Sequence, residues 1–382
     1  MGFLQRLSGG RPPGAACVQT APRNLGWDSP SHRQALLTAE HRLYERLRES
    51  VPLVDAAIQK IVRLVGGFRL DCTDPDAQDQ LRRFAAGVPV GGVQTGLDAF
   101  LSCYLDDLLT YGGAAGEIVL NEEQDGIFAL YNSPLSALEV AAPNSPVQAE
   151  FFRRDGLTVS PIAQPGLILY SALGPEAGEL RGRSLLRGLP MIGDILMRIY
   201  ECIGKNFDRV GNVRFAVTYR PGDNAVDAAS AREIAQNIAQ EWGEAMSASA
   251  KGRVKDFVAV GDVDIKVIGA DNQVIDTKVP VEQMLQQMVA KLGLPPFLLG
   301  LSWSTTERMS KQQADILTSE LEAYRRVLTP VIQKICGVFL ALEGIAADVT
   351  VEWDMINLQD ELETAQAQLL LAQAAKEQEE TE

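Results

Sequence analysis

The chain has 382 residues and a formal net charge of −15, from 50 acidic and 35 basic residues. Proteins that bind the phosphate backbone of DNA normally carry a surface patch rich in Lys and Arg. The excess of acidic over basic residues therefore argues against a conventional DNA-binding protein. Aromatic residues make up only 6% of the chain, which is few for a protein that binds single strands by stacking bases.

Residue types that support catalysis, metal binding or disulfide formation are sparse. The five cysteines are scattered and form no C-x-x-C pair, and the only two histidines are His32 and His41. We therefore expect reduced thiols, with no metal and no other cofactor. The common nucleotide-binding, serine-nucleophile and zinc-protease motifs are all missing from the sequence, so we predict no catalytic residues and no enzyme. No apolar run approaches the roughly 20 residues that span a bilayer, which predicts a soluble protein without a membrane partner.

The N-terminal part begins with a segment unsuited to packing. Residues 1–35 are rich in Gly, Pro and Ser and predict a flexible arm. Apolar residues at helical spacing follow from Leu36, and Pro52 opens a second helical pattern that Gly66 and Gly67 close.

A mixed region comes next. Residues 97–111 have the pattern of an amphipathic helix, which Gly112 and Gly113 end. Strand-like segments bounded by turn residues lie at 116–120, 127–131 and 167–171. The region 36–190 is therefore predicted to be an α+β domain.

The second half is mostly helical but is interrupted by a small β-α-β unit. A long helix is predicted at 191–209, and a strand at 213–219 follows it. A helix after Asp227 leads to a second strand at 262–268, and both strands alternate apolar and polar residues. At about 60 residues, this unit is small for a free-standing domain.

Helical patterns then resume. One begins at Pro280 and ends at Leu292, and the polar stretch 302–310 separates it from the longest helical pattern, at 311–342. Pro330 lies inside that pattern, so we expect the helix to be kinked or split there. A strand at 349–353 precedes an acidic helical segment.

This order of elements resembles the portal proteins of tailed bacteriophages. The resemblance extends from about residue 50 to residue 355 and rests on the order and spacing of its segments. Those segments are PLVDAAIQKIVRLVGG (52–67), LILYSALGPEAGELRGRSLLRGLP (167–190), the helix 281–292 with its Leu-Pro-Pro exit, and TERMSKQQADILTSELEAYRRVLTPVIQKI (306–335).

The resemblance implies an α+β, portal-type subunit. Its parts would be an N-terminal arm (1–35), a wing (36–190), a first stem helix (191–211), a clip (212–272), a second stem helix (273–300), a tunnel loop (301–310), a long kinked helix with a wing strand (311–357) and a crown-like C-terminal helix (358–382).

A portal-type subunit would function in a ring of twelve copies at one vertex of the virion capsid, assembled in the host cytoplasm. Double-stranded DNA would be packaged and ejected through this ring, and an acidic channel would let the duplex slide because it repels phosphate within the screening length of about 8 Å. The implied partners are further copies of the chain, the terminase large subunit, the major capsid and scaffold proteins, and the head-tail connector.

The resemblance assigns the DNA-channel contacts to the tunnel loop. The residues concerned are Ser302, Trp303, Ser304, Thr305, Thr306, Glu307, Arg308 and Met309. The alternative is a surface loop in which Thr305 or Thr306 caps the following helix.

The clip strands would join neighbouring subunits and present the docking face for the packaging ATPase and the connector. Their apolar residues are Val213, Phe215, Val217 and Tyr219 on one strand and Val263, Ile265 and Val267 on the other. The alternative is an ordinary α/β subdomain with internal edges.

Three other interpretations stay open. Arg181, Arg183 and Arg187 form a basic cluster, which we expect to pair with carboxylates rather than bind phosphate or capsid. The whole chain could instead be a non-portal phage structural or adaptor protein with a helix-rich α+β fold. An enzyme whose site carries no known motif is the third interpretation.

Overall fold

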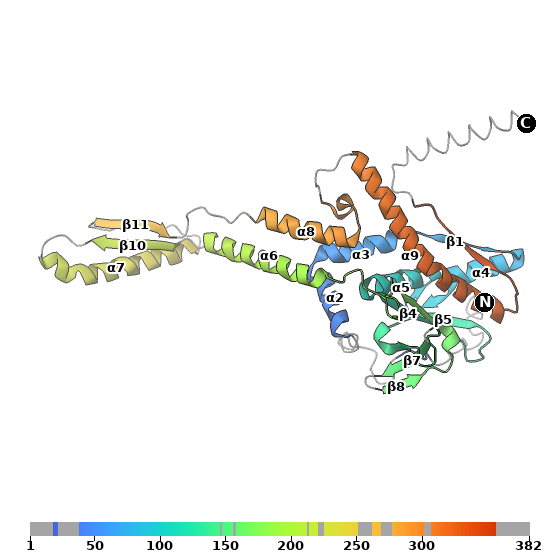
Figure 1. The fold of residues 1–382 in the computed structure, drawn as a ribbon. Coiled ribbons are helices and arrows are strands. Elements are labelled where there is room, and N and C mark those ends of the chain that lie inside the picture. The colour runs from blue at the N-terminus through green and yellow to red at the C-terminus, as the bar shows by residue number, and fades with distance from the viewer. Residues whose placement is uncertain are drawn as a thin grey trace, which may run out of the picture. The chain divides into compact units, whose positions relative to one another are not determined.

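A computed structural model describes residues 18–21, 38–145, 147–155, 158–211, 214–220, 225–250, 262–268, 277–301 and 307–356 (Figure 1). The chain divides into two compact units, one formed by Met1–Asp194 with Met284–Glu382 and the other by Ile195–Gln283. Helices and sheets are both present, which confirms the predicted α+β class.

A five-stranded sheet forms the centre of the first unit. Its strands, in spatial order, are β3 (Gln94–Thr95), β2 (Pro89–Val90), β5 (Ile127–Ser133), β4 (Gly113–Leu120) and β9 (Ile168–Ala172). Every residue of β4 is buried, as expected for a strand with neighbours on both sides. Helix α5 (Leu97–Tyr111) packs closely on β4, since a Cβ atom at Gly116 would lie 2.6 Å from the ring of Phe100.

The predicted helix 97–111 has the predicted bounds. It ends because Gly112 adopts a left-handed φ of 80°, which a residue with a side chain rarely takes. The predicted strands at 116–120, 127–131 and 167–171 correspond to β4, β5 and β9.

The opposite face of the sheet is covered by a small antiparallel sheet. Its strands are β6 (Leu138–Ala141), β7 (Glu150–Asp155) and β8 (Thr158–Pro161), with short 3-10 turns at Leu135–Ala137 and Pro165–Leu167. Ala115 of β4 packs there with Leu138, Ile162 and Ile168. The sequence patterns predicted none of these three strands.

The remaining elements of the first unit come from the N-terminal and C-terminal parts of the chain, which pack against each other. Helices α2 (Ala39–Ser50) and α3 (Pro52–Leu64) precede β1 (Phe68–Cys72), which pairs antiparallel with β12 (Val349–Trp353). Helix α4 (Pro75–Gly87), which was not predicted, contacts α9 (Glu307–Leu342). The rings of Phe84 and Phe339 stack there with their centroids 4.2 Å apart. Pro52 begins α3 and the predicted strand 349–353 has its exact bounds, so both predictions are confirmed.

Helix α9 differs from the prediction at two points. It begins at Glu307 rather than 311, because Glu, Arg and Met are good helix formers and a carboxylate is favoured in the first turn. It also continues through Pro330, so of the two expected outcomes the split is wrong, while the kink stays a prediction. The buried side chains of Leu328, Val331 and Ile332 flank the proline, and their packing offsets the lost backbone hydrogen bond.

The second unit contains the predicted β-α-β order. Its elements are the greater part of α6 (Leu189–Gly211), then β10 (Arg214–Arg220), α7 (Ala225–Ala250), β11 (Asp262–Ile268) and the first residues of α8 (Lys278–Leu292). The rest of α8 and the 3-10 turn that follows it at Pro296–Leu299 belong to the first unit. Strands β10 and β11 pair antiparallel, with Val217 opposite Ile265 and Tyr219 opposite Val263. No helix in the described part of the chain is long and apolar enough to cross a membrane.

Candidate functional site

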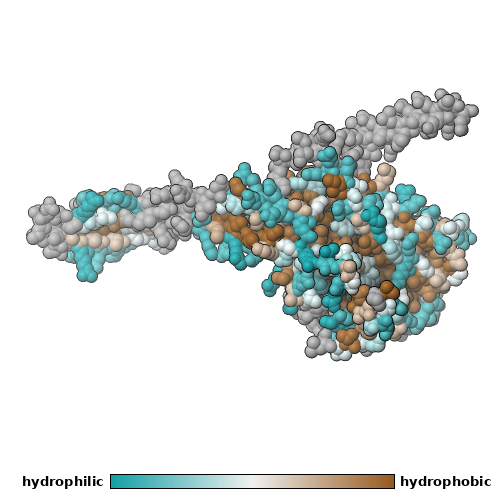
Figure 2. All heavy atoms as spheres, in the orientation of Figure 1, coloured by the Kyte–Doolittle hydropathy of each residue, from teal (hydrophilic) through white to brown (hydrophobic). Residues whose placement is uncertain are grey.

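Helix α6 presents an apolar face that is only partly covered in the described part of the chain. Ile195, Ile199 and Ile203 follow one another at four-residue spacing, and Phe207 continues the row. Phe207 is 65% exposed and Tyr200, beside this row, is 44% exposed. Apolar side chains of this part of the surface gather along α6 (brown in Figure 2). Soluble monomers seldom expose contiguous apolar patches of this kind, which mark contact sites for other proteins.

Strands β10 and β11 form a sheet of only two strands. Within the described residues each strand therefore has one outer edge without a strand partner. Ile265 is 40% exposed, and Val217, Tyr219 and Val263 are partly buried. Because an isolated two-stranded sheet is marginally stable and its edges can accept further strands, this element is suited to pairing with another chain. Val213 and the side chains of Phe215 and Val267 lie outside the described residues.

The predicted tunnel-loop residues divide into two groups. Ser302–Thr306 lie outside the described residues, as does the alternative cap at Thr305 or Thr306. Glu307, Arg308 and Met309 belong to the first turn of α9, which corrects their assignment to a loop. If these three residues contact DNA in a channel, they do so from the N-terminal end of a helix and not from a loop.

The basic cluster pairs with carboxylates, as predicted. An Arg181 guanidinium nitrogen lies 3.0 Å from a Glu139 carboxylate oxygen, and Arg187 and Arg183 lie 3.2 and 3.6 Å from Glu176. All three arginines are exposed, so each pair contributes little to stability.

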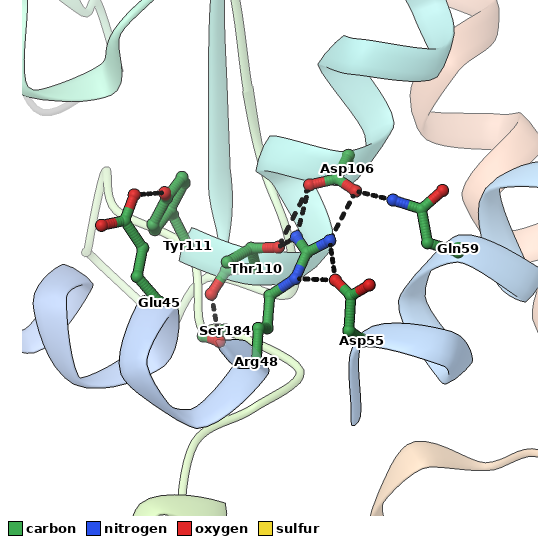
Figure 3. A network of polar contacts seen from close by, with 8 residues as sticks. All are labelled: Glu45, Arg48, Asp55, Gln59, Asp106, Thr110, Tyr111 and Ser184. Atoms are coloured by element: carbon green, nitrogen blue, oxygen red, sulfur yellow. Dashed lines mark hydrogen bonds and ion pairs between the residues drawn. The ribbon is translucent and has the colours of Figure 1, made fainter. Parts of the chain in front are cut away.

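A polar network that the sequence did not reveal joins three helices of the first unit (Figure 3). Arg48 of α2 donates to Asp55 of α3 through Nε at 2.8 Å, and to Asp106 and Thr110 of α5 at 3.0 and 2.7 Å. Gln59 of α3 donates to the same Asp106 carboxylate at 3.4 Å. Burial lowers the pKa of Arg48, but the hydrogen bonds and charges of Asp106 and Asp55 outweigh it, so the pKa is raised and the charge is held.

The network lines a groove of about 870 Å³, which Glu45, Glu49 and Asp107 also line. Among the residues that the structure describes, no cluster of three or more His, Cys, Asp or Glu side chains could hold a metal ion. Arg48 and Asp106 lie 58 positions apart, and no spacing rule could have paired them. The arrangement holds the three helices together.

Replacing Arg48 with Met should lower the free energy of unfolding by about 2 kcal/mol, because Asp106 loses its main partner while it stays partly buried. Urea denaturation followed by circular dichroism measures this loss. The matched control is Arg46→Met on the same helix, since Arg46 is exposed, and we expect it to change stability by less than about 0.5 kcal/mol. Equal losses for the two variants would contradict a structural role for the network.

No protein-family model and no curated protein matches the sequence. Solved structures do. A chain of the virion of a native gene transfer agent (GTA) particle superposes with a TM-score of 0.59 at 14% identity, over 94% of this chain and 92% of that one. A chain of the native GTA particle neck, computed with C12 symmetry, gives 0.55 at 15% identity, over 85% of this chain and 89% of that one.

A phage portal protein of the HK97 family from Corynebacterium diphtheriae gives a TM-score of 0.41 at 12% identity, over 80% of this chain and 92% of that one. A TM-score below 0.5 does not establish a shared fold. The first two show the fold alone: the chain shares its fold with chains of the GTA virion and of the GTA neck.

Proposed function

We propose that the chain is the portal subunit of a tailed phage or phage-like particle. Copies of it would form a closed ring at one capsid vertex, and double-stranded DNA would pass through the ring during packaging and ejection. The protein would act as a structural conduit and not as an enzyme.

The observation that carries this proposal is the partly covered apolar face of α6 in a chain that shares its fold with a chain of the GTA neck. A subunit that meets its neighbours head to tail in a closed ring needs an adhesive surface on each flank. The α6 face and the outer edges of the β10–β11 sheet are two such surfaces. The C12 symmetry of the GTA neck supports a ring of twelve copies.

The charge of the chain agrees with a conduit. At −15 per subunit, a ring carries a large excess of negative charge, which repels the phosphate backbone at short range. DNA would therefore pass with little adhesion. The β10–β11 unit would form the clip that docks the terminase large subunit and then the connector, while the first unit would face the major capsid and scaffold proteins.

Counting the copies in purified assemblies tests the proposal. Mass photometry and negative-stain images should show rings of about twelve subunits over a range of salt concentrations. A protein that remains a monomer throughout, including with scaffold protein present, would instead favour a structural or adaptor protein outside the portal class. Nucleotide turnover by the pure protein would contradict the non-enzymatic assignment.

The tunnel loop can be tested separately. We expect that exchanging residues 302–306 for a Gly/Ser linker of equal length leaves ring assembly intact but reduces packaged DNA at least tenfold, because the channel loses its contacts with the duplex. The exchange stops before Glu307 so that α9 keeps its first residue. Nuclease-protected DNA per particle is the measurement, and packaging at the level of the natural chain would exclude the tunnel role.

A further inference from the structure

Glu117 is a carboxylate in the middle of a protein core. It lies on β4, the strand between β5 and β9, and its side chain is 1% exposed. Side chains alternate along a strand, so Glu117 lies on the opposite face from Gly116, which contacts Phe100 of α5. Tyr131 lies opposite Glu117 on the neighbouring strand β5. The burial of Tyr131 and the negative charge of Glu117 both raise the pKa of the Tyr131 hydroxyl. A buried carboxylate of this kind is costly unless hydrogen bonds satisfy both of its oxygens.

A short N-terminal segment supplies those hydrogen bonds. The backbone N–H of Gln19 donates to Oε1 of Glu117 at 2.8 Å. The backbone N–H and the hydroxyl of Thr20 both donate to Oε2, at 2.9 and 2.7 Å. Thr20 has no exposed surface, so this segment, residues 18–21, is inserted into the molecule rather than laid on it.

A second set of contacts fixes the direction of the segment. The side chain of Gln19 forms two hydrogen bonds with the backbone of Gln164: it accepts from the N–H at 2.8 Å and donates to the carbonyl at 3.3 Å. The side chain of Gln164 in turn donates to Gln124 at 3.3 Å. The segment is therefore recognised through its backbone, its Gln amide and its Thr hydroxyl together.

This geometry points to a peptide-binding site centred on Glu117, whose ligand is a short turn with a Gln-Thr pair. The charge-assisted bonds to Glu117 are the strong kind, and the hydroxyl and the amide supply the specificity. The ligand is attached through the 16 residues between positions 21 and 38, which can span up to about 50 Å when extended. We assign the turn to the same subunit, because Gln19 and Thr20 of the same chain contact Glu117 and this linker is long enough to reach the site. The site does not depend on the proposed ring.

Peptide competition tests the site in the full-length chain. Thr20→Pro removes the Thr20 N–H and hydroxyl and should vacate the site. A fluorescein-labelled peptide of residues 14–25, with Ser in place of Cys17, should then bind saturably in an anisotropy titration. Binding should weaken at least tenfold for a peptide with Thr20→Val and for a chain that combines Thr20→Pro with Glu117→Gln. A folded Thr20→Pro chain that binds no peptide, or binds the Thr20→Val peptide equally well, would overturn the proposal.

Crosslinking in a chain that keeps Thr20 and Glu117 tests the source of the turn and does not depend on Thr20→Pro folding. Cysteines placed at Gln19 and Gln164, in a chain whose own five cysteines are replaced, should react with a short bismaleimide, because the backbone N–H groups of residues 19 and 20 and the Thr20 hydroxyl still bind Glu117. Crosslinks within one chain are expected, and a ladder of linked chains would overturn the assignment to the same subunit. Failure to crosslink either way would overturn the site itself.

Discussion

A chain with Ile195→Asp and Phe207→Asp is expected to stay monomeric under conditions in which the natural chain forms rings. Both side chains lie on the exposed apolar face of α6, where Phe207 is 65% and Ile195 37% exposed. Burying one large apolar side chain at an interface contributes about 1.5–3 kcal/mol, and a closed ring repeats this gain at every contact. Aspartate would reverse the gain, because a charge would have to be buried without a partner.

Mass photometry measures the change, and circular dichroism verifies that the variant is folded. The matched control places two aspartates on the polar face of the same helix, as Arg198→Asp with Lys205→Asp. We expect this control to assemble as the natural chain does, although it carries even more negative charge. Rings formed by the apolar-face variant, or lost equally in the control, would show that α6 is not the adhesive surface.

Replacing Arg325 with Met is expected to lower the free energy of unfolding by about 3 kcal/mol, which is more than the loss expected for Arg48→Met. Arg325 lies on α9 and is 3% exposed. Its guanidinium donates twice to the Val65 carbonyl, at 2.9 and 2.6 Å, and once to the Asp354 carbonyl, at 2.8 Å. It also lies 5.2 Å from the ring centroid of Trp353.

These contacts join the end of α3, helix α9 and the end of β12, so the variant would leave the buried Val65 carbonyl without its donor. The midpoint of urea denaturation measures the loss. Arg326→Met is the control, since Arg326 is the next residue on the helix but is exposed. Arg325→Lys should regain only part of the loss, because an ammonium group lacks the forked geometry that reaches two carbonyls. A stable Arg325→Met variant would contradict the role of this contact.

The elements that the sequence predicted well are those whose signals are local. Helix α5 has apolar residues at helical spacing and a glycine directly after its last turn, and both its bounds agree with the prediction. Strand β11 alternates apolar and charged residues and also has the predicted bounds. Such patterns depend only on neighbouring residues and on the periods of helix and strand.

The missed elements lack those signals. All four residues of β8 are exposed, so the strand shows no alternation that a pattern could detect. Helix α4 buries only Ala77 and Leu81, and most of its other residues are charged, amide or small side chains. Both elements exist because other parts of the chain pack beside them, which no local pattern records.

The pairing of distant polar residues likewise came only from the tertiary structure. Arg48 meets Asp106, Arg325 meets the Val65 carbonyl, and Thr20 meets Glu117, across 58, 260 and 97 positions. The sequence contains 50 acidic residues, and nothing in their spacing distinguishes the one that is buried at the centre of a sheet. Burial selects the partner, and burial is a property of the whole fold.

The sequence by itself determined the order of helices and strands from α6 to β12, the acidic charge and the amphipathic character of the helix at 191–209. Whether that apolar face is covered within the chain was decided only by the tertiary structure, which leaves Phe207 and Tyr200 exposed. The periodicity of the sequence indicates that a helix has an apolar side. The free energy gained by burying that side depends on which surface packs against it. For α6, the proposed ring would supply the remaining surface.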